Sequence, residues 1–141
     1  MSRYFGRLTL GAGSVVAAAA LTVAPVAAAT TIGTSTSAKA STSHVSAGAT
    51  FSISGKVKHG SIGLSGQVVY LYERNGKTPR WTKASPVGLP SALTSATGTY
   101  AFVNVVALKK GEQFRVVHPA QTVGGKKYGR SVSRIITVTR R

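Results

Sequence analysis

The chain has no cysteine, no aspartate and only two carboxylate side chains, Glu73 and Glu112, among its 141 residues. Without thiols, neither a disulfide framework nor a cysteine-ligated zinc site can hold the fold together. The three histidines, His44, His59 and His118, are far apart in the sequence and form no metal-binding motif. We therefore expect a fold that is stabilised by apolar burial and a hydrogen-bonded backbone, with no metal and no cofactor.

The shortage of acids also argues against the common catalytic chemistries. A glycosidase needs two carboxylates about 5 to 10 Å apart, and we interpret Glu73 and Glu112 instead as surface carboxylates beside neighbouring cations. A Ser-His-acid triad has no nucleophile elbow in this sequence. His118 precedes Pro119 at a predicted strand end, where we expect it to cap the strand or to face solvent. Calcium loops require aspartate, which is absent. We predict a protein that is not an enzyme.

The N-terminal segment has the layout of a secretory signal peptide, which we assign to residues 1–29. Residues 1–7 are basic, residues 8–23 are uncharged and apolar, and residues 27–29 are three alanines that suit a signal peptidase. Glycines and polar residues dilute the apolar run, whereas a permanent membrane anchor wants about 20 solidly apolar residues. We expect no such anchor, a secreted or cell-wall-associated protein, and one small domain at residues 30–141.

Positive charge is abundant. Eighteen Lys and Arg residues give the chain a formal net charge of +16. Without the two arginines of the predicted signal peptide, 16 cations remain against two acids, which is a net charge of +14. This balance makes anionic surfaces and polymers the natural partners. The cations are spread along the domain and are not gathered in one tail.

After the predicted signal peptide, the sequence has no long stretch with the apolar period of a helix. It has short runs of alternating apolar residues, separated by Gly, Pro and Asn. This pattern is typical of an antiparallel β-sandwich or barrel. The predicted strands are residues 50–58, 67–74, 79–84, 92–95, 100–105, 113–118 and 131–139. The predicted loops are residues 58–66, 107–112 and 119–130, and Asn75-Gly76 is a predicted tight turn. Residues 30–46, rich in Ser and Thr, fit either a flexible linker or a first strand.

Several segments carry a resemblance to a known family. They are Gly48 with residues 51–57 (FSISGKV), residues 66–74 (GQVVYLYER), Trp81, residues 97–102 (TGTYAF), and residues 114–117 (FRVV) with Tyr128, Ser131 and Ser133. Together, residues 31–139 resemble the bacterial immunoglobulin-like domains of secreted and cell-surface proteins, especially actinobacterial ones. The resemblance implies a single all-β immunoglobulin-like sandwich of about seven strands. It also favours residues 31–37 as a first strand, and the neutral or basic turns imply no calcium role.

Two groups of side chains are candidate binding sites. Alternate loops lie at opposite ends of such a sandwich, so the 58–66 and 119–130 loops would share one end. The first group is Lys58, His59, Lys126, Lys127 and Arg130. The alternative interpretation is that the 119–130 loop is mobile and solvated and has no specific partner.

The second group mixes aromatic rings with cations, which can stack on sugars or bases while they pair with anions. Its members are Tyr72, Arg74, Arg80, Trp81 and Lys83, with Tyr70 beside them. The alternative interpretation is that Trp81 and one tyrosine only cover the core.

Charge and predicted secretion together suggest a function. We expect a non-catalytic binding or adhesion module that associates electrostatically with an anionic cell-wall polymer or acidic polysaccharide. The alternative is a diffusing cationic effector outside the cell: an antimicrobial, an inhibitor or a nucleic-acid binder. Nucleic acid would bind this charge non-specifically in vitro. No feature of the sequence specifies an oligomeric state.

Overall fold

The structure, a computed structural model, describes residues 30–76, 78, 80–84, 90–107 and 111–141. The predicted signal peptide lies outside these residues and stays a prediction. The fold below is that of the compact unit Thr31–Arg141. Throughout its described residues the regular structure is β-strand, which confirms the all-β class. No helix in this part of the chain is long and apolar enough to cross a membrane.

One sheet is built around the longest strand, β5 (Thr50–His59). Along one edge, β5 pairs with β10 (Thr99–Val106). Along the other edge, it pairs with the short strands β2 (Ser35–Thr36) and β3 (Lys39–Ala40). The chain then turns after β5, and β6 (Ile62–Gly63) folds back on its end. All four pairings are antiparallel, as the sequence predicts.

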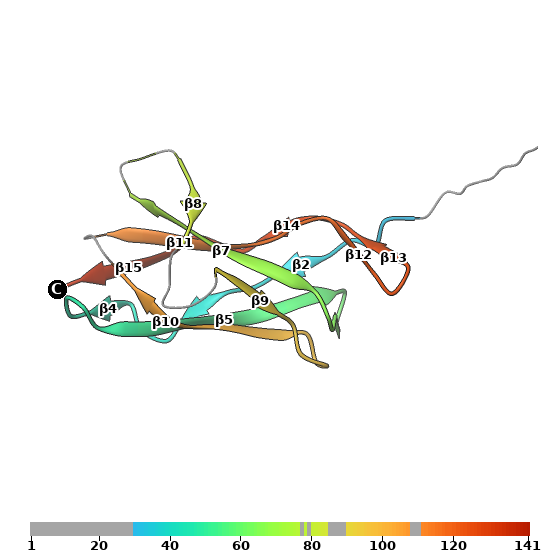
Figure 1. Ribbon diagram of the computed structural model, residues 1–141, viewed down its shortest axis with the longest axis horizontal. Coiled ribbons are helices and arrows are strands. Elements are labelled where there is room, and N and C mark those ends of the chain that lie inside the picture. The colour runs from blue at the N-terminus through green and yellow to red at the C-terminus, as the bar shows by residue number, and fades with distance from the viewer. Residues whose placement is uncertain (1–29, 77, 79, 85–89, 108–110) are drawn as a thin grey trace, which may run out of the picture. The chain divides into compact units, whose positions relative to one another are not determined.

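A second sheet faces the first (Figure 1). Its strands, in spatial order, are β4 (His44–Val45), β15 (Ile136–Arg140), β11 (Glu112–His118), β7 (Val68–Asn75) and β8 (Thr82–Lys83). The short strands β14 (Ser131–Val132) and β9 (Ser91–Leu93) pair with β11 and β7. The β4–β15 pair is parallel, so the sheet is mixed where antiparallel pairing was predicted. The N-terminal segment thus joins both sheets, because β2 and β3 belong to the first and β4 to the second.

The two sheets enclose one apolar core, and strand alternation decides which side chains enter it. The buried apolar side chains of the main strands are Phe51, Ile53, Val57, Val69, Leu71, Tyr100, Phe102, Val105, Phe114, Val116, Ile136 and Val138. Across the sheets, the Phe51 and Phe114 rings meet edge-on with centroids 5.5 Å apart. A register shift between Phe102 and Val105, where Asn104 has a φ of 58°, keeps both of those residues inward.

Close backbone contact fastens the N-terminal segment to the first sheet. The Tyr100 hydroxyl donates a hydrogen bond to the Ser37 carbonyl oxygen. A Cβ atom at Gly55 would collide with the same oxygen, so only glycine lets the two strands approach this closely. Burial raises the pKa of Tyr100, which keeps its hydroxyl protonated and able to donate.

Two segments that were predicted as loops contain strands. Residues 119–130 form a hairpin of β12 (Gln121–Val123) and β13 (Lys126–Tyr128). The intervening glycines have φ values of 59° and 79°, which suit a tight hairpin turn. Residues 58–66 likewise hold the end of β5 and all of β6. The glycine and lysine content of both segments suggested irregular loops, but β-forming residues flank each glycine turn.

The last predicted strand, residues 131–139, is interrupted. The Ser133 hydroxyl accepts the backbone N–H of Val116 at 2.8 Å and donates to the Arg134 carbonyl at 2.9 Å. A side chain therefore replaces a main-chain partner in the ladder, which separates β14 from β15. The predicted strand around Trp81 is similarly shorter than expected, since only Thr82–Lys83 pairs with β7.

Candidate binding face on the second sheet

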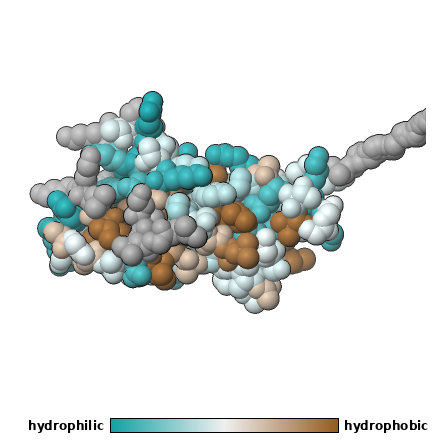
Figure 2. Space-filling model, in the orientation of Figure 1, coloured by the Kyte–Doolittle hydropathy of each residue, from teal (hydrophilic) through white to brown (hydrophobic). Residues whose placement is uncertain are grey.

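Strand alternation gives β7 two chemically different sides. Val69 and Leu71 are fully buried toward the core, whereas Tyr70, Tyr72 and Arg74 point outward and are half-buried. This opposite orientation follows from the two-residue period of the strand. In the view of Figure 2, hydrophilic residues gather along the upper side, over β8 and the outer side of this sheet. The outer side of β7 is therefore the place where the second predicted group can form.

Neighbouring strands add cations in register with the β7 aromatics. Tyr72 is paired with Lys83 of β8 on one side and with Arg115 of β11 on the other. These three residues form one row across the sheet. Arg74 lies two residues further along β7, opposite Gln113, and its Nε donates to the Gln113 Oε1 at 2.8 Å. We call Tyr70, Tyr72, Arg74, Trp81, Lys83 and Arg115 the aromatic–cationic face.

Cations and rings of this face contact each other directly. The guanidinium carbons of Arg74 and Arg115 each lie 4.4 Å from the centroid of the Trp81 ring. The Lys83 ammonium lies 4.5 Å from the Tyr70 ring centroid. Such contacts are worth about 0.5–1 kcal/mol each at exposed sites and about 2 kcal/mol when they are desolvated. Trp81 is half-buried against these cations and does not belong to the core.

Arg115, which sequence reasoning missed as a site residue, is central to the face. Burial lowers its pKa, and repulsion from Arg130 and Arg74 lowers it further. Its Nε atom is buried without a hydrogen-bond partner in the described part of the chain. Its position between Phe114 and Val116 was a usable signal, because a residue between two core positions of a strand faces outward.

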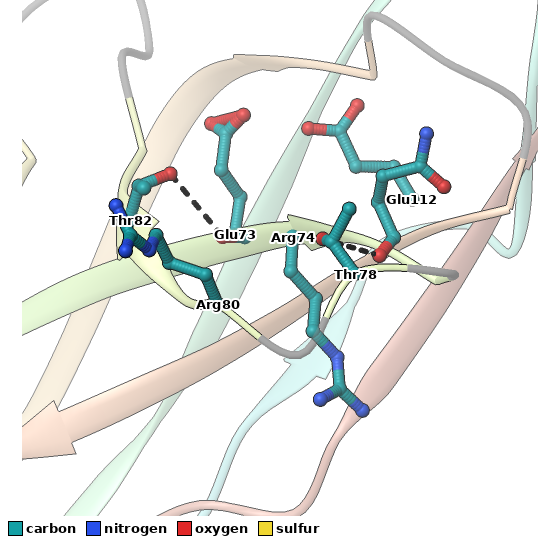
Figure 3. A pocket seen from close by; sticks show the side chains of 7 residues that line it. Glu73, Arg74, Thr78, Arg80, Thr82 and Glu112 are labelled. Carbon is teal, nitrogen blue, oxygen red and sulfur yellow. Dashed lines mark hydrogen bonds between the residues drawn. The ribbon is translucent and has the colours of Figure 1, made fainter.

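The two acids lie on the other side of the same strands. Glu73 has the inward parity of Val69 and Leu71, and Glu112 has the parity of Phe114. Both carboxylates line a cavity of about 350 Å³ at the end of the sheet, together with Asn75, Thr78, Arg80, Thr82 and Arg74. In Figure 3 the two carboxylates extend to one side of the strand and the Arg74 side chain to the other.

This arrangement corrects one expectation. Glu112 is only 3% exposed, so the interpretation of both acids as surface carboxylates is wrong for this residue. An inward position at the start of β11 takes its side chain away from solvent. Arg80, which was grouped with Trp81, lines the cavity that holds the acids, as Arg74 also does. The other four members of the second predicted group lie on the aromatic–cationic face.

The first predicted group does share one end of the domain. The His59 Nδ1 donates to the Gly33 carbonyl oxygen at 2.7 Å, and the backbone N–H of Ile32 donates to the Lys127 carbonyl at 2.8 Å. Residues 32–33 thus connect the end of β5 with the β12–β13 hairpin. His59, Lys126 and Lys127 are exposed there, with Lys58 half-buried nearby in β5. Arg130 directly precedes β14, which pairs with the strand that carries Arg115, and its charge also lowers the pKa of Arg115, so it extends the aromatic–cationic face.

The expectation that His118 caps the strand or faces solvent is wrong. It is completely buried, with Nδ1 at 2.9 Å from the Gly129 carbonyl oxygen and Nε2 at 2.7 Å from the Gln67 Oε1. Burial lowers the pKa of His118, which favours the neutral imidazole. The physical reason for the difference is its even position on β11, which continues the inward series of Phe114 and Val116 up to Pro119.

The described residues therefore define a small all-β domain of two facing sheets with a basic, aromatic outer face on one of them. Within the described ranges, no group of three or more metal-ligating side chains lies close enough together to hold an ion. No protein-family model matches the chain, and no curated protein matches its sequence.

Proposed function

We propose that this protein is a secreted, non-catalytic, immunoglobulin-like binding module that associates electrostatically with anionic polymers of the cell envelope. The observation that carries the proposal is the aromatic–cationic face. It presents Arg74, Lys83 and Arg115, with Arg130 close by, and none of its members is an acid. The domain's two carboxylates have the opposite parity on the same strands, and they line a cavity together with Arg74 and Arg80.

The order of the strands supports the immunoglobulin-like part of the proposal. The first segment pairs with β5 in one sheet and then crosses to pair in parallel with the last strand, β15. β15, β11 and β7 are consecutive neighbours in the second sheet. Immunoglobulin-like domains also pack two sheets around a shared core, and this likeness supports the proposal. The predicted signal peptide supports the extracellular location.

Retention on purified cell-wall material tests the proposal. The protein should bind at low salt and elute near roughly 0.5 M salt, because screening then shortens the range of exposed charges to a few Å. Fractionation of cells that express the protein should place it in the wall fraction. Recovery only in the medium, with no retention at low salt, would instead support the diffusing cationic effector.

A matched pair of triple variants separates the face from net charge. Replacing Arg74, Lys83 and Arg115 by Gln should lower retention far more than replacing Lys39, Lys56 and Arg141, which are exposed cations outside the face. Both variants lose three positive charges, so a purely global attraction would weaken them equally. Equal elution of the two would show that the aromatic–cationic face is not the binding site.

A further inference from the structure

We infer that the aromatic–cationic face is a phosphate site, in which Arg74, Arg115 and Arg130 bind the phosphate groups of a sugar- or polyol-phosphate polymer. Trp81 acts as a positioning residue that holds two of the guanidinium groups. The inference rests on the proposed function and narrows it from anionic polymers in general to one chemical class.

The Arg115 guanidinium has an unsatisfied hydrogen-bond donor within the described part of the protein. Its Nε is enclosed without an acceptor, and the side chain is held by contact with the Trp81 ring. A guanidinium carries five N–H donors in a fixed planar arrangement and no acceptor. An oxyanion that reaches the rim of this half-buried group would supply the acceptors that the described residues do not.

The crowding of the arginines favours phosphate over carboxylate. The guanidinium carbons of Arg74 and Arg115 both lie 4.4 Å from the centroid of the Trp81 ring, so two like charges are close together. Besides burial, repulsion from Arg130 and from Arg74 lowers the pKa of Arg115, in agreement with this crowding. A carboxylate and a phosphodiester link each carry one negative charge, but the two carboxylate oxygens lie in one plane with their carbon, whereas the four oxygens of the phosphate are arranged tetrahedrally. Several guanidinium groups can therefore approach one phosphate from different directions, and each can bind it in a bidentate manner.

Occupied aromatic faces argue against recognition of nucleic-acid bases. Single-stranded nucleic acids are bound by stacking of bases on open aromatic rings. Here the Trp81 ring already has two guanidinium groups within 4.4 Å of its centroid, and Lys83 lies over the Tyr70 ring. The Trp81 and Tyr70 rings therefore hold the cations in place. A ligand that approaches this face contacts the cations before it can stack on these rings.

Trp81 is the only tryptophan of the chain, so its fluorescence reports on this face directly. The purified full chain is titrated with poly(glycerol phosphate) and with polygalacturonate of similar length and charge, both at 50 mM salt. We expect the phosphate polymer to bind at least about tenfold tighter, which corresponds to about 1.4 kcal/mol. Free inorganic phosphate should compete more effectively than acetate.

Conservative variants test the role of the arginines. Arg115→Lys keeps the charge but removes the planar bidentate donor, so the preference for phosphate should fall towards parity. Arg134→Lys, an exposed arginine outside the face, should leave the preference unchanged. Arg130 is exposed, so Arg130→Lys offers the same test in a variant whose folding does not depend on a half-buried side chain. Circular dichroism confirms that each variant is folded.

Each outcome has one meaning. Equal affinity for the two polymers, or an unchanged preference in both Arg115→Lys and Arg130→Lys, overturns the phosphate site while the electrostatic proposal stands. Failure of every polyanion to bind at 50 mM salt overturns the proposed function itself. Tighter binding of oligothymidylate than of a base-free phosphate oligomer of equal length would show base stacking and would also reject this inference.

Discussion

The two sides of β7 and β11 carry different kinds of side chains. Outward positions hold Arg74, Arg115 and the tyrosines, all half-buried, whereas inward positions hold core side chains and both glutamates. Adjacent residues such as Phe114 and Arg115 thus belong to different chemical environments. The two-residue period of the strands thus places the two acids on the side opposite to the outward rings and cations of the same strands.

The largest expected difference in unfolding free energy is between alanine variants of two consecutive residues, Phe114 and Arg115. Phe114→Ala removes a fully buried ring that packs against Phe51, and it should cost about 3–5 kcal/mol of unfolding free energy. Arg115→Ala should cost only about 1 kcal/mol, because it removes one cation–aromatic contact from the outer side. Urea unfolding of both variants measures the contrast. Similar losses for the two would mean that the outer side is part of the stabilising core.

A second contrast concerns pH, because the inward side contains a buried histidine. Burial lowers the pKa of His118 in the folded state, so the unfolded chain takes up a proton at higher pH than the native protein does. The contribution to stability is complete above about pH 6.5 and is lost as the pH falls below it, by at most about 1.4 kcal/mol per pH unit. Urea unfolding between pH 7.5 and 5 measures this slope.

His118→Gln should flatten that pH dependence while it lowers stability at neutral pH. His59→Gln provides the control, since His59 is an exposed histidine with one hydrogen bond to Gly33. If both variants keep the slope of the unaltered protein, another titrating group causes the acid loss.

Much of this contrast could be read from the alternation of residues. Val69 and Leu71 against Tyr70 and Tyr72 followed directly from the two-residue period, and the structure confirms it. The same two-residue period places Arg115 on the outer side and His118 on the inner side of β11. These two orientations were not predicted, because the neighbouring residues suggested other roles. Arg115 stands apart from every run of cations, and the position of His118 at the strand end, before Pro119, suggested a capping or solvent-facing role.

Other parts of the site depend on contacts that no local pattern contains. Arg130 joins the face through its proximity to Arg115, although 15 positions separate them in the chain. Arg80 and Trp81 are neighbours in the sequence, yet one lines the acid-bearing cavity and the other contacts Arg74. Which way such side chains point depends on the path of the connection between β7 and β8, and composition does not specify that path.

On the outer side, Trp81→Leu removes the ring that two guanidinium groups share. The loss should be about 1–2 kcal/mol of unfolding free energy, from two contacts of about 0.5–1 kcal/mol each. Tyr128→Leu changes another half-buried aromatic, in the β12–β13 hairpin, and is the matched comparison. Circular dichroism follows the unfolding of both, since the first variant has no tryptophan. The phosphate preference, measured by competition, should weaken only in the Trp81 variant.

The smallest expected effect on stability is that of Lys83, at the edge of the aromatic–cationic face. Lys83→Gln removes the ammonium over the Tyr70 ring and should cost about 0.5 kcal/mol, because Lys83 is exposed and water competes for its charge. Lys56→Gln, at an exposed lysine on the first sheet, should change stability less than that. Thermal unfolding at 20 mM and 500 mM salt compares them. A loss for Lys83→Gln that exceeds the loss for Trp81→Leu would place the stabilising centre of the face at β8 and not at the Trp81 ring, and the ranking of the two residues would have to be reversed.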